Sequence, residues 1–270
     1  MIGIAADGSG YGLDGAIWGC EVLKADLVGF ERLAHLAYVP LPGGEQAVRQ
    51  PWRMAAVHLH AAYGAAFAEL PLPLVRAIAP ARWRPLAQLI ERGLNSPPTS
   101  SLGRLFDAVA ALAGVSPAEL TGSVSYEGQA AAQLEALAAT AEDRSGEALY
   151  PFAIVDGAPV QLDIRPLLRA LVDDLLHGTP AALVALRFHH SVAELLAACC
   201  LAVSRRIGIR HVALSGGVFQ NRLLLERLVA RLAALDFEVY VNRRVPPNDG
   251  GLSLGQAAVA AARLERGMLS

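Results

Sequence analysis

The first forty residues carry short apolar runs separated by polar and glycine-rich positions, a pattern that predicts β-strands. Residues 2–6 form one such run, which stops at the turn-rich stretch from Asp7 to Gly12. Residues 16–23 and 27–39 contain many β-favouring side chains and predict two further strands, antiparallel to the first. The chain is therefore expected to begin with antiparallel strands, the first of which ends in a glycine-rich loop.

A helical pattern runs from Trp52 to about residue 141, where Ala, Leu, Arg and Glu dominate. Helix breakers interrupt it at Pro71, Pro73, Pro80 and residues 95–98. Residues 102–114 fit a helix with Leu105, Phe106 and Val109 on one side. This middle part therefore predicts several helices and no strand.

The second half of the chain alternates strands and helices. Residues 150–164 predict two strands around the hairpin pair Asp156-Gly157, and helices follow at about 163–177 and 181–206. The remaining pattern predicts strand, helix, strand and helix, at residues 211–214, 218–235, 237–241 and 252–265. This alternation favours a parallel sheet covered by helices, so the expected fold class is α/β.

Composition limits the classes of function. The 270 residues are 54% hydrophobic and 18% charged, enough for a sizeable core in one large domain or two lobes. The net charge is −2, so no basic field exists to hold a nucleic acid. The sequence has no uninterrupted apolar run long enough to predict a membrane span, and its N terminus does not have the pattern of a signal peptide. Cys20, Cys199 and Cys200 predict inert core thiols, compatible with a reducing cytoplasm.

The histidines do not form a recognisable metal motif. His58 and His60 are two residues apart, and His189 and His190 are adjacent. Neither spacing puts both rings on one face of a helix. We therefore expect all seven histidines to be structural or on the surface.

Two glycine-rich turns are candidates for binding an anion. Gly216 and Gly217 lie between a predicted strand and a predicted helix, where the backbone can approach a ligand and the helix N terminus offers free N–H groups. Gly8, Gly10 and Gly12 could form a nest of backbone amides. Taken alone, the first turn also fits a tight strand-to-helix connection, and the second fits a glycine-rich β-turn.

Three carboxylates and one amide could act with these turns. Asp7 closes the first strand and Asp249 precedes the last helix, so both could bind a cation at the carboxyl ends of strands, although Asp249 also fits a helix N-cap. Asp107 stands in an apolar helix and could accept hydrogen bonds from a ribose or face solvent. Asn221, about one turn into its helix, could reach a ribose or a base, or face solvent.

The order of these motifs resembles that of a known family. The stretches that carry the resemblance are ADGSGYGLDG, NSPPTSSLGRLFDAVA, SYEGQ, SGGVFQN and PPNDGG. Over residues 2–261 the chain resembles the C-terminal part of the carbamoyltransferase domain of HypF proteins. The resemblance implies a two-lobed α/β fold of the actin-like ATPase, ribonuclease-H-like type, with nucleotide between the lobes and, here, an incomplete N-terminal lobe.

The resemblance also implies a reaction and a set of site residues. HypF proteins transfer a carbamoyl group from carbamoyl adenylate, made with ATP, to the C-terminal cysteine of HypE in nickel–iron hydrogenase maturation. The residues expected to face the nucleotide are Gly8, Ser9, Gly10, Gly12, Asp107, Gly128, Gly216, Gly217 and Asn221. Asp7 and Asp249 would bind a divalent metal, which could be zinc, iron or magnesium. No catalytic nucleophile is expected here, because the attacking thiol belongs to the partner.

The chain departs from the family in the parts that precede its first strand. The family places an HxxxH metal motif upstream of the strand that begins this chain, and nothing later in the sequence replaces it. The acylphosphatase, zinc-finger and adenylate-forming domains also have no counterpart here. We therefore expect residues 1–270 to need the N-terminal HypF domains as partners to complete the reaction.

Two other functions stay open from the sequence. The missing histidine pair also fits a non-catalytic module that docks a HypE-like partner. A relative of the tRNA threonylcarbamoyl-adenosine transferases shares the architecture, but the net charge of −2 and the family-specific motifs argue against it.

Overall fold

One mixed β-sheet organises the molecule. The computed structural model describes residues 1–78, 80–115, 120–141 and 148–268. The strands in these ranges are β1 (Ile2–Tyr11), β2 (Ile17–Ala25), β3 (Phe30–Leu36), β4 (Val39–Pro40), β5 (Pro98–Thr99), β6 (Ala153–Val155), β7 (Val160–Asp163), β8 (His211–Ser215) and β9 (Glu238–Val241). They form one sheet in the order β6-β7-β3-β2-β1-β8-β9, and β5 joins it by pairing with β2 and β4.

The pairing directions confirm two sequence predictions. β1, β2 and β3 are antiparallel neighbours, whereas β1, β8 and β9 run parallel. β6 and β7 form the predicted antiparallel hairpin. β1 lies between β2 and β8, and its residues Ile2, Ile4 and Ala6 are buried at alternate positions. The expectation that the middle of the chain holds no strand is wrong at β5, where Pro98 and Thr99 pair with β4.

The glycine-rich stretch is part of a strand and not a loop. β1 continues to Tyr11, and its register against β2 shifts between Ala6 and Gly10. The shift is a bulge, which leaves the residues between them out of the ladder. Gly10 then pairs with Trp18, whose carbonyl oxygen lies 3.1 Å from the place of a Cβ on Gly10. Glycine allows this close strand pairing, so the stretch continues the strand that we expected it to end.

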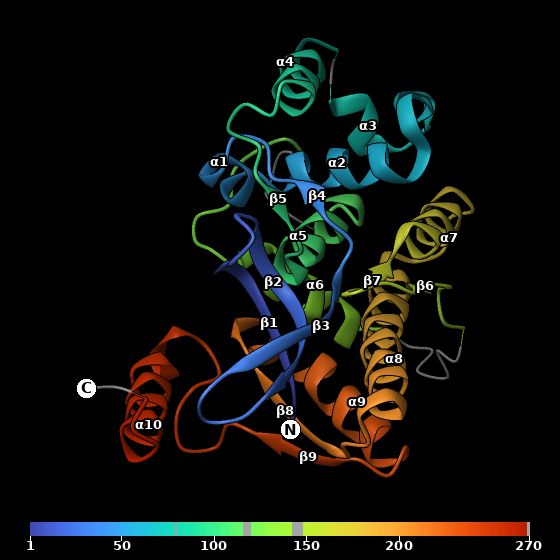
Figure 1. The fold of residues 1–270 in the computed structure, drawn as a ribbon. Coiled ribbons are helices and arrows are strands. Elements are labelled where there is room, and N and C mark those ends of the chain that lie inside the picture. The colour runs from blue at the N-terminus through green and yellow to red at the C-terminus, as the bar shows by residue number, and fades with distance from the viewer. Residues whose placement is uncertain (79, 116–119, 142–147, 269–270) are drawn as a thin grey trace.

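Helices lie on and around the sheet, with α3 and α4 at one end of the molecule and α10 at its edge (Figure 1). They are α1 (Glu45–Arg49), α2 (Pro51–Tyr63), α3 (Pro73–Ala77), α4 (Pro80–Glu91), α5 (Leu102–Leu112), α6 (Gln129–Ala139), α7 (Arg165–Leu176), α8 (Ala181–Ile207), α9 (Arg222–Ala233) and α10 (Leu252–Glu265). Short 3₁₀ turns are η1 (Gly64–Glu69), η2 (Gly217–Gln220) and η3 (Asp249–Gly251). The predicted helix at 218–235 is thus split at Asn221, which is the N-cap of α9.

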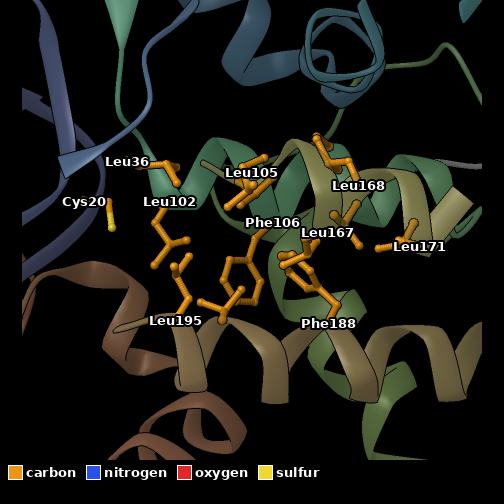
Figure 2. Close-up of a cluster of buried hydrophobic side chains, with 14 of the residues drawn as sticks. Cys20, Leu36, Leu102, Leu105, Phe106, Leu167, Leu168, Leu171, Phe188 and Leu195 are labelled. Atoms are coloured by element: carbon orange, nitrogen blue, oxygen red, sulfur yellow. The ribbon is translucent and has the colours of Figure 1, made fainter. Parts of the chain in front are cut away.

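Helix α5 lies at the centre of the core. It contacts β1, β2, α2 and α6, and ten of its eleven residues are buried, so it is not the one-sided helix that we expected. Figure 2 shows Phe106 of α5 facing Phe188 of α8. Their ring centroids are 4.9 Å apart at 68°, an edge-to-face contact. The position of α5 matters for function because its N-terminal turn meets the bulge of β1.

Helix α8 is a core helix. It is long and apolar enough to cross a membrane, but 72% of its most apolar window is buried inside the protein. Cys199 and Cys200 on α8 are fully buried, as is Cys20 on β2, and all three are free thiols as predicted. Burial raises the pKa of the Cys199 thiol to about 12, which keeps it protonated and unreactive.

Candidate functional site

A cleft of about 1080 Å³ brings together segments that are far apart in the chain. The bulge of β1, the first turns of α5 and α6, η2 and η3 all contribute to its wall. Eight of the expected site residues line it: Asp7, Gly8, Ser9, Asp107, Gly128, Gly217, Asn221 and Asp249. Asp7 and Asp249 are therefore on one cavity, which the sequence motif order suggested but could not demonstrate.

Three expected site residues lie outside the lining of this cleft. Gly10 and Gly12 pack against the β2 side of the hairpin, beside Trp18 and Ala16. Gly216 has φ of 111°, and a Cβ there would stand 2.1 Å from the carbonyl oxygen of Ala6. These glycines serve the backbone packing of β1 and β8, and their contact with a nucleotide stays a prediction.

The backbone of Gly217 lies beside the carboxylate of Asp7. A Cβ at Gly217 would lie 3.1 Å from Oδ1 of Asp7, which also accepts a hydrogen bond from the Gly8 amide at 2.8 Å. On the other side, Asn248 caps η3 by accepting a hydrogen bond from the Gly250 amide. The N-cap of α10 is Gly251, with no side-chain cap, so Asp249 does not have the N-cap role considered for it and lines the cleft instead.

The divalent metal is not supported by the described residues. Asp7 and Asp249 offer two carboxylates, a donor type that hard cations prefer. Within residues 1–78, 80–115, 120–141 and 148–268, no three His, Cys, Asp or Glu side chains are grouped to hold a metal ion. Two carboxylates fit part of a coordination shell only, so no step of the chemistry is assigned to a metal.

Asp107 is buried in an ion pair at the cleft wall. Asp107 is only 3% exposed, so the alternative that it faces solvent is wrong. Oδ2 of Asp107 lies 2.8 Å from Nη1 of Arg104, one turn earlier in α5, but the angle is unsuited to a hydrogen bond and Nη1 has no hydrogen-bond partner. Burial raises the pKa of the Asp107 carboxyl to about 6, against the opposing effect of Arg104.

Arg104 joins three parts of the site, and the sequence motifs did not single it out. Its Nη2 lies 2.7 Å from Oε1 of Glu127, and its Nε donates to the Gly8 carbonyl at 3.3 Å. Ser101, the N-cap of α5, donates to the same carbonyl at 2.7 Å and accepts from the Arg104 amide. A signal was present in the sequence, because Arg104 and Asp107 have the i, i+3 spacing of a helical ion pair.

The N terminus of α9 does not offer free N–H groups, contrary to expectation. Oε1 of Glu135 on α6 accepts from the amides of Arg222 and Leu223, at 2.7 and 3.2 Å. Asn221 accepts from the Leu224 amide at 2.9 Å. The carboxylate of Glu135 therefore occupies the place where we expected a phosphate. The backbone of η2, which lines the cleft at Gly217, remains the candidate for phosphate binding.

Asn221 is oriented by a buried histidine. Its Nδ2 lies 2.9 Å from Nε2 of His189, and Nδ1 of the same ring lies 2.7 Å from the Ala185 carbonyl. Burial lowers the pKa of His189 to about 4, so the ring is neutral, donates from Nδ1 and accepts at Nε2. One hydrogen of the Asn221 amide remains for a ligand in the cleft. The structural role expected for His189 is confirmed.

Comparison with known proteins defines first a class and then a family. Residues 3–256 match the family model described as carbamoyltransferase, Kae1-like domain, second subdomain. The chain is 40% identical to carbamoyltransferase HypF2 of Cupriavidus necator and 41% identical to carbamoyltransferase HypF of Rhodobacter capsulatus, over 97% of its length in both cases. It therefore belongs to the HypF carbamoyltransferase family.

Solved structures agree in fold. A full-length HypF in a phosphate- and nucleotide-bound form superposes with a TM-score of 0.90 at 40% identity, and covers all of this chain. The HypF of T. kodakarensis superposes with a TM-score of 0.82 at 30% identity. This chain spans 34% and 32% of the two curated relatives, and 40% and 35% of these two structures. The expected α/β fold is confirmed as that of the Kae1-like domain.

Proposed function

We propose that this chain binds the adenylate in a carbamoyltransferase and serves carbamoyl transfer in hydrogenase maturation. The observation that carries the proposal is the cleft itself, which gathers the expected nucleotide contacts of β1, α5, η2 and η3 around one cavity. A solved relative with 40% identity is described as phosphate- and nucleotide-bound, which supports a nucleotide as the ligand.

In the proposed reaction the substrate is carbamoyl adenylate and the acceptor is a cysteine thiol. The thiolate of the C-terminal cysteine of a HypE-like partner attacks the carbamoyl carbon, the bond from that carbon to the phosphate oxygen breaks, and AMP leaves. The proton of the thiol goes to solvent and the product is a thiocarbamate. The leaving group is already good, so the protein needs chiefly to position the reactants.

Three side chains of the cleft have roles in this proposal. Asp107 accepts hydrogen bonds from the ribose hydroxyls, and Asn221 donates its remaining amide hydrogen to the nucleoside. Tyr126, which is 61% exposed at the cleft, offers a ring on which the adenine base can stack. If a divalent cation is bound with the nucleotide, Asp7 and Asp249 hold it and it neutralises phosphate charge.

The proposal includes the context of the reaction. The upstream HypF domains supply the adenylate, and the free thiols of this chain fit the reducing cytoplasm. The wall contains carboxylates from Asp7, Glu127 and Asp249. Its two arginines, Arg49 and Arg104, are already paired with carboxylates, so a cation or backbone donors beside the phosphate would favour its binding. This is consistent with an adenylate, whose phosphate carries less charge than ATP.

Calorimetric titration tests the proposal. ATP and a non-hydrolysable adenylate analogue are titrated into the protein with magnesium present. We expect Asn221→Ala and Asp249→Ala each to weaken binding of the analogue at least tenfold. Asn242→Ala and Asp156→Ala remove the same groups from exposed positions outside the cleft lining, and should leave the affinity unchanged. Equal affinity of all four variants and the wild type would refute the assignment.

A further inference from the structure

Arg104 is a buried cation at the wall of the cleft. Among the described residues, the arginines that line the cleft are Arg49 and Arg104. The side chain of Arg49 is 61% exposed, whereas that of Arg104 is 3% exposed. A guanidinium has five N–H donors, and within the described protein Arg104 uses only Nε and Nη2 in hydrogen bonds, to the Gly8 carbonyl and to Glu127. Arg104 is therefore a positive group with spare donors beside the proposed nucleotide.

Two carboxylates share this one guanidinium, and they differ in exposure. Oδ2 of Asp107 lies 2.8 Å from Nη1, and the Asp107 side chain is 4% exposed. Oε1 of Glu127 lies 2.7 Å from Nη2, and the Glu127 side chain is 63% exposed. The buried carboxylate compensates the charge of Arg104 without help from the second one. Solvent screens the exposed carboxylate, so its departure costs little. Asp107 is therefore the lasting partner of Arg104, and Glu127 is the exchangeable one.

The exchangeable ion pair lies directly on the bulge of β1. A Cβ added to Gly8 would stand 2.5 Å from Nη2 of Arg104 and 2.9 Å from Oε1 of Glu127. Gly8 belongs to the glycine-rich stretch that the sequence indicated as an anion site. The carboxylate of Glu127 therefore occupies a position in which an anionic group of a ligand would meet both the backbone of the bulge and Arg104.

The attachment of Glu127 to the protein allows its side chain to leave. Glu127 lies in the turn before α6, next to Gly128, which is the N-cap of that helix and has φ of 82°. In the part of the chain that the structure describes, the Glu127 carboxylate has no hydrogen-bond partner other than Arg104. Rotation of this one side chain toward solvent would therefore uncover Nη2 of Arg104 and break no other hydrogen bond of the carboxylate.

We infer that Arg104 binds the phosphate of the nucleotide and that Glu127 holds its place until the nucleotide arrives. The phosphate takes the position of the Glu127 carboxylate on Nη2, and Glu127 turns to solvent. The phosphate of an acyl adenylate carries one negative charge, as Glu127 does, so the exchange leaves the charge of the wall nearly unchanged. Hydrogen bonds from arginine to phosphate are short and strong, which favours the exchange. The inference rests on the proposed function, because it requires a nucleotide in the cleft.

Calorimetric titration with AMP and with adenosine tests the inference, because these ligands differ only in the phosphate. Glu127→Gln removes the competing charge, so we expect AMP to bind roughly fivefold tighter or more and adenosine to bind as in the wild type. Glu45→Gln is the matched control, since Glu45 also lines the cleft and pairs with an arginine, and it should change neither affinity. Arg104→Lys keeps the charge but loses the planar fork, so the ratio of AMP to adenosine affinity should fall roughly tenfold.

The possible outcomes separate this inference from the proposed function. Glu127 and Glu45 are exposed, so both glutamine variants should fold and keep the wild-type melting curve. Equal tightening of AMP by both variants would indicate a general effect of charge and overturn the inference. Unchanged AMP affinity in Glu127→Gln, or an unchanged affinity ratio in Arg104→Lys, would also overturn it and leave nucleotide binding intact. If neither AMP nor adenosine binds the wild type, the proposed function fails and this inference fails with it.

Discussion

The buried pair Arg104–Asp107 offers a direct measure of how the site is built. In Arg104→Met the methionine keeps much of the apolar stem but removes the guanidinium that faces Asp107, Glu127 and the Gly8 carbonyl. Both members of the pair have side chains less than 5% exposed. Removing one partner from a buried ion pair typically costs about 3–5 kcal/mol, since the other charge stays buried without compensation.

The expected loss of unfolding free energy depends on pH, because the charge of the Asp107 carboxyl changes with pH. The pKa of Asp107 is about 6 in the folded protein, above its value of 3.8 in the unfolded chain. At pH 8 the carboxyl is charged, so we expect Arg104→Met to lose about 3–5 kcal/mol of unfolding free energy. At pH 5 the carboxyl is mostly neutral in the wild type too. The loss should then shrink to about 1 kcal/mol, the contribution of the hydrogen bonds from Arg104 to Glu127 and to the Gly8 carbonyl.

Urea unfolding followed by circular dichroism at both pH values measures these losses. Arg222→Met is the matched control, because its ion pair with Glu226 is exposed and screened by solvent and should contribute little to stability. The double variant Arg104→Met with Asp107→Leu should recover most of the loss at pH 8, since no unpaired charge remains. A loss in Arg104→Met that is equal at both pH values, or smaller than that of the control, would contradict this account.

Three further predictions concern single positions. Gly216→Ala should cost about 3 kcal/mol or more in urea unfolding, because its Cβ would meet the Ala6 carbonyl at positive φ, whereas Gly255→Ala, with nothing within 4 Å, should be stabilising by about 0.5–1 kcal/mol. His58 is fully buried without a hydrogen-bond partner, and burial lowers its pKa to about 4. The unfolded chain therefore takes up the proton first, and the free energy of unfolding falls as the pH drops from 6.5 to 4. His58→Leu should remove about 3 kcal/mol of that fall in thermal melts across this pH range. Glu135→Ala uncovers two α9 amides, which should lower stability by about 1–2 kcal/mol and allow sulfate to raise the melting temperature more than in the wild type.

The sequence alone carried much of the fold and the family. Alternating apolar runs predicted β2, β3, β6, β7, β8 and β9 because the strand period is local and needs no knowledge of partners. Short motifs rich in glycine and aspartate indicated the family. Close approach of the backbone to a ligand requires glycine, and cation binding requires carboxylates. Eight of the eleven site residues expected from these motifs line the cleft, including Asp7 and Asp249 at opposite ends of the chain.

Only the tertiary structure decided how those residues are used. Asp107 is buried because α5 is surrounded on all sides, and the apolar pattern of one helix cannot say what packs against its polar positions. The N terminus of α9 is capped by Glu135, 87 residues earlier in the chain, so a helix end that looked free in the sequence is filled. Local periodicity determines which segments form helices and strands. Burial, capping and ion pairing depend on groups brought together from distant segments, and those only the folded chain could reveal.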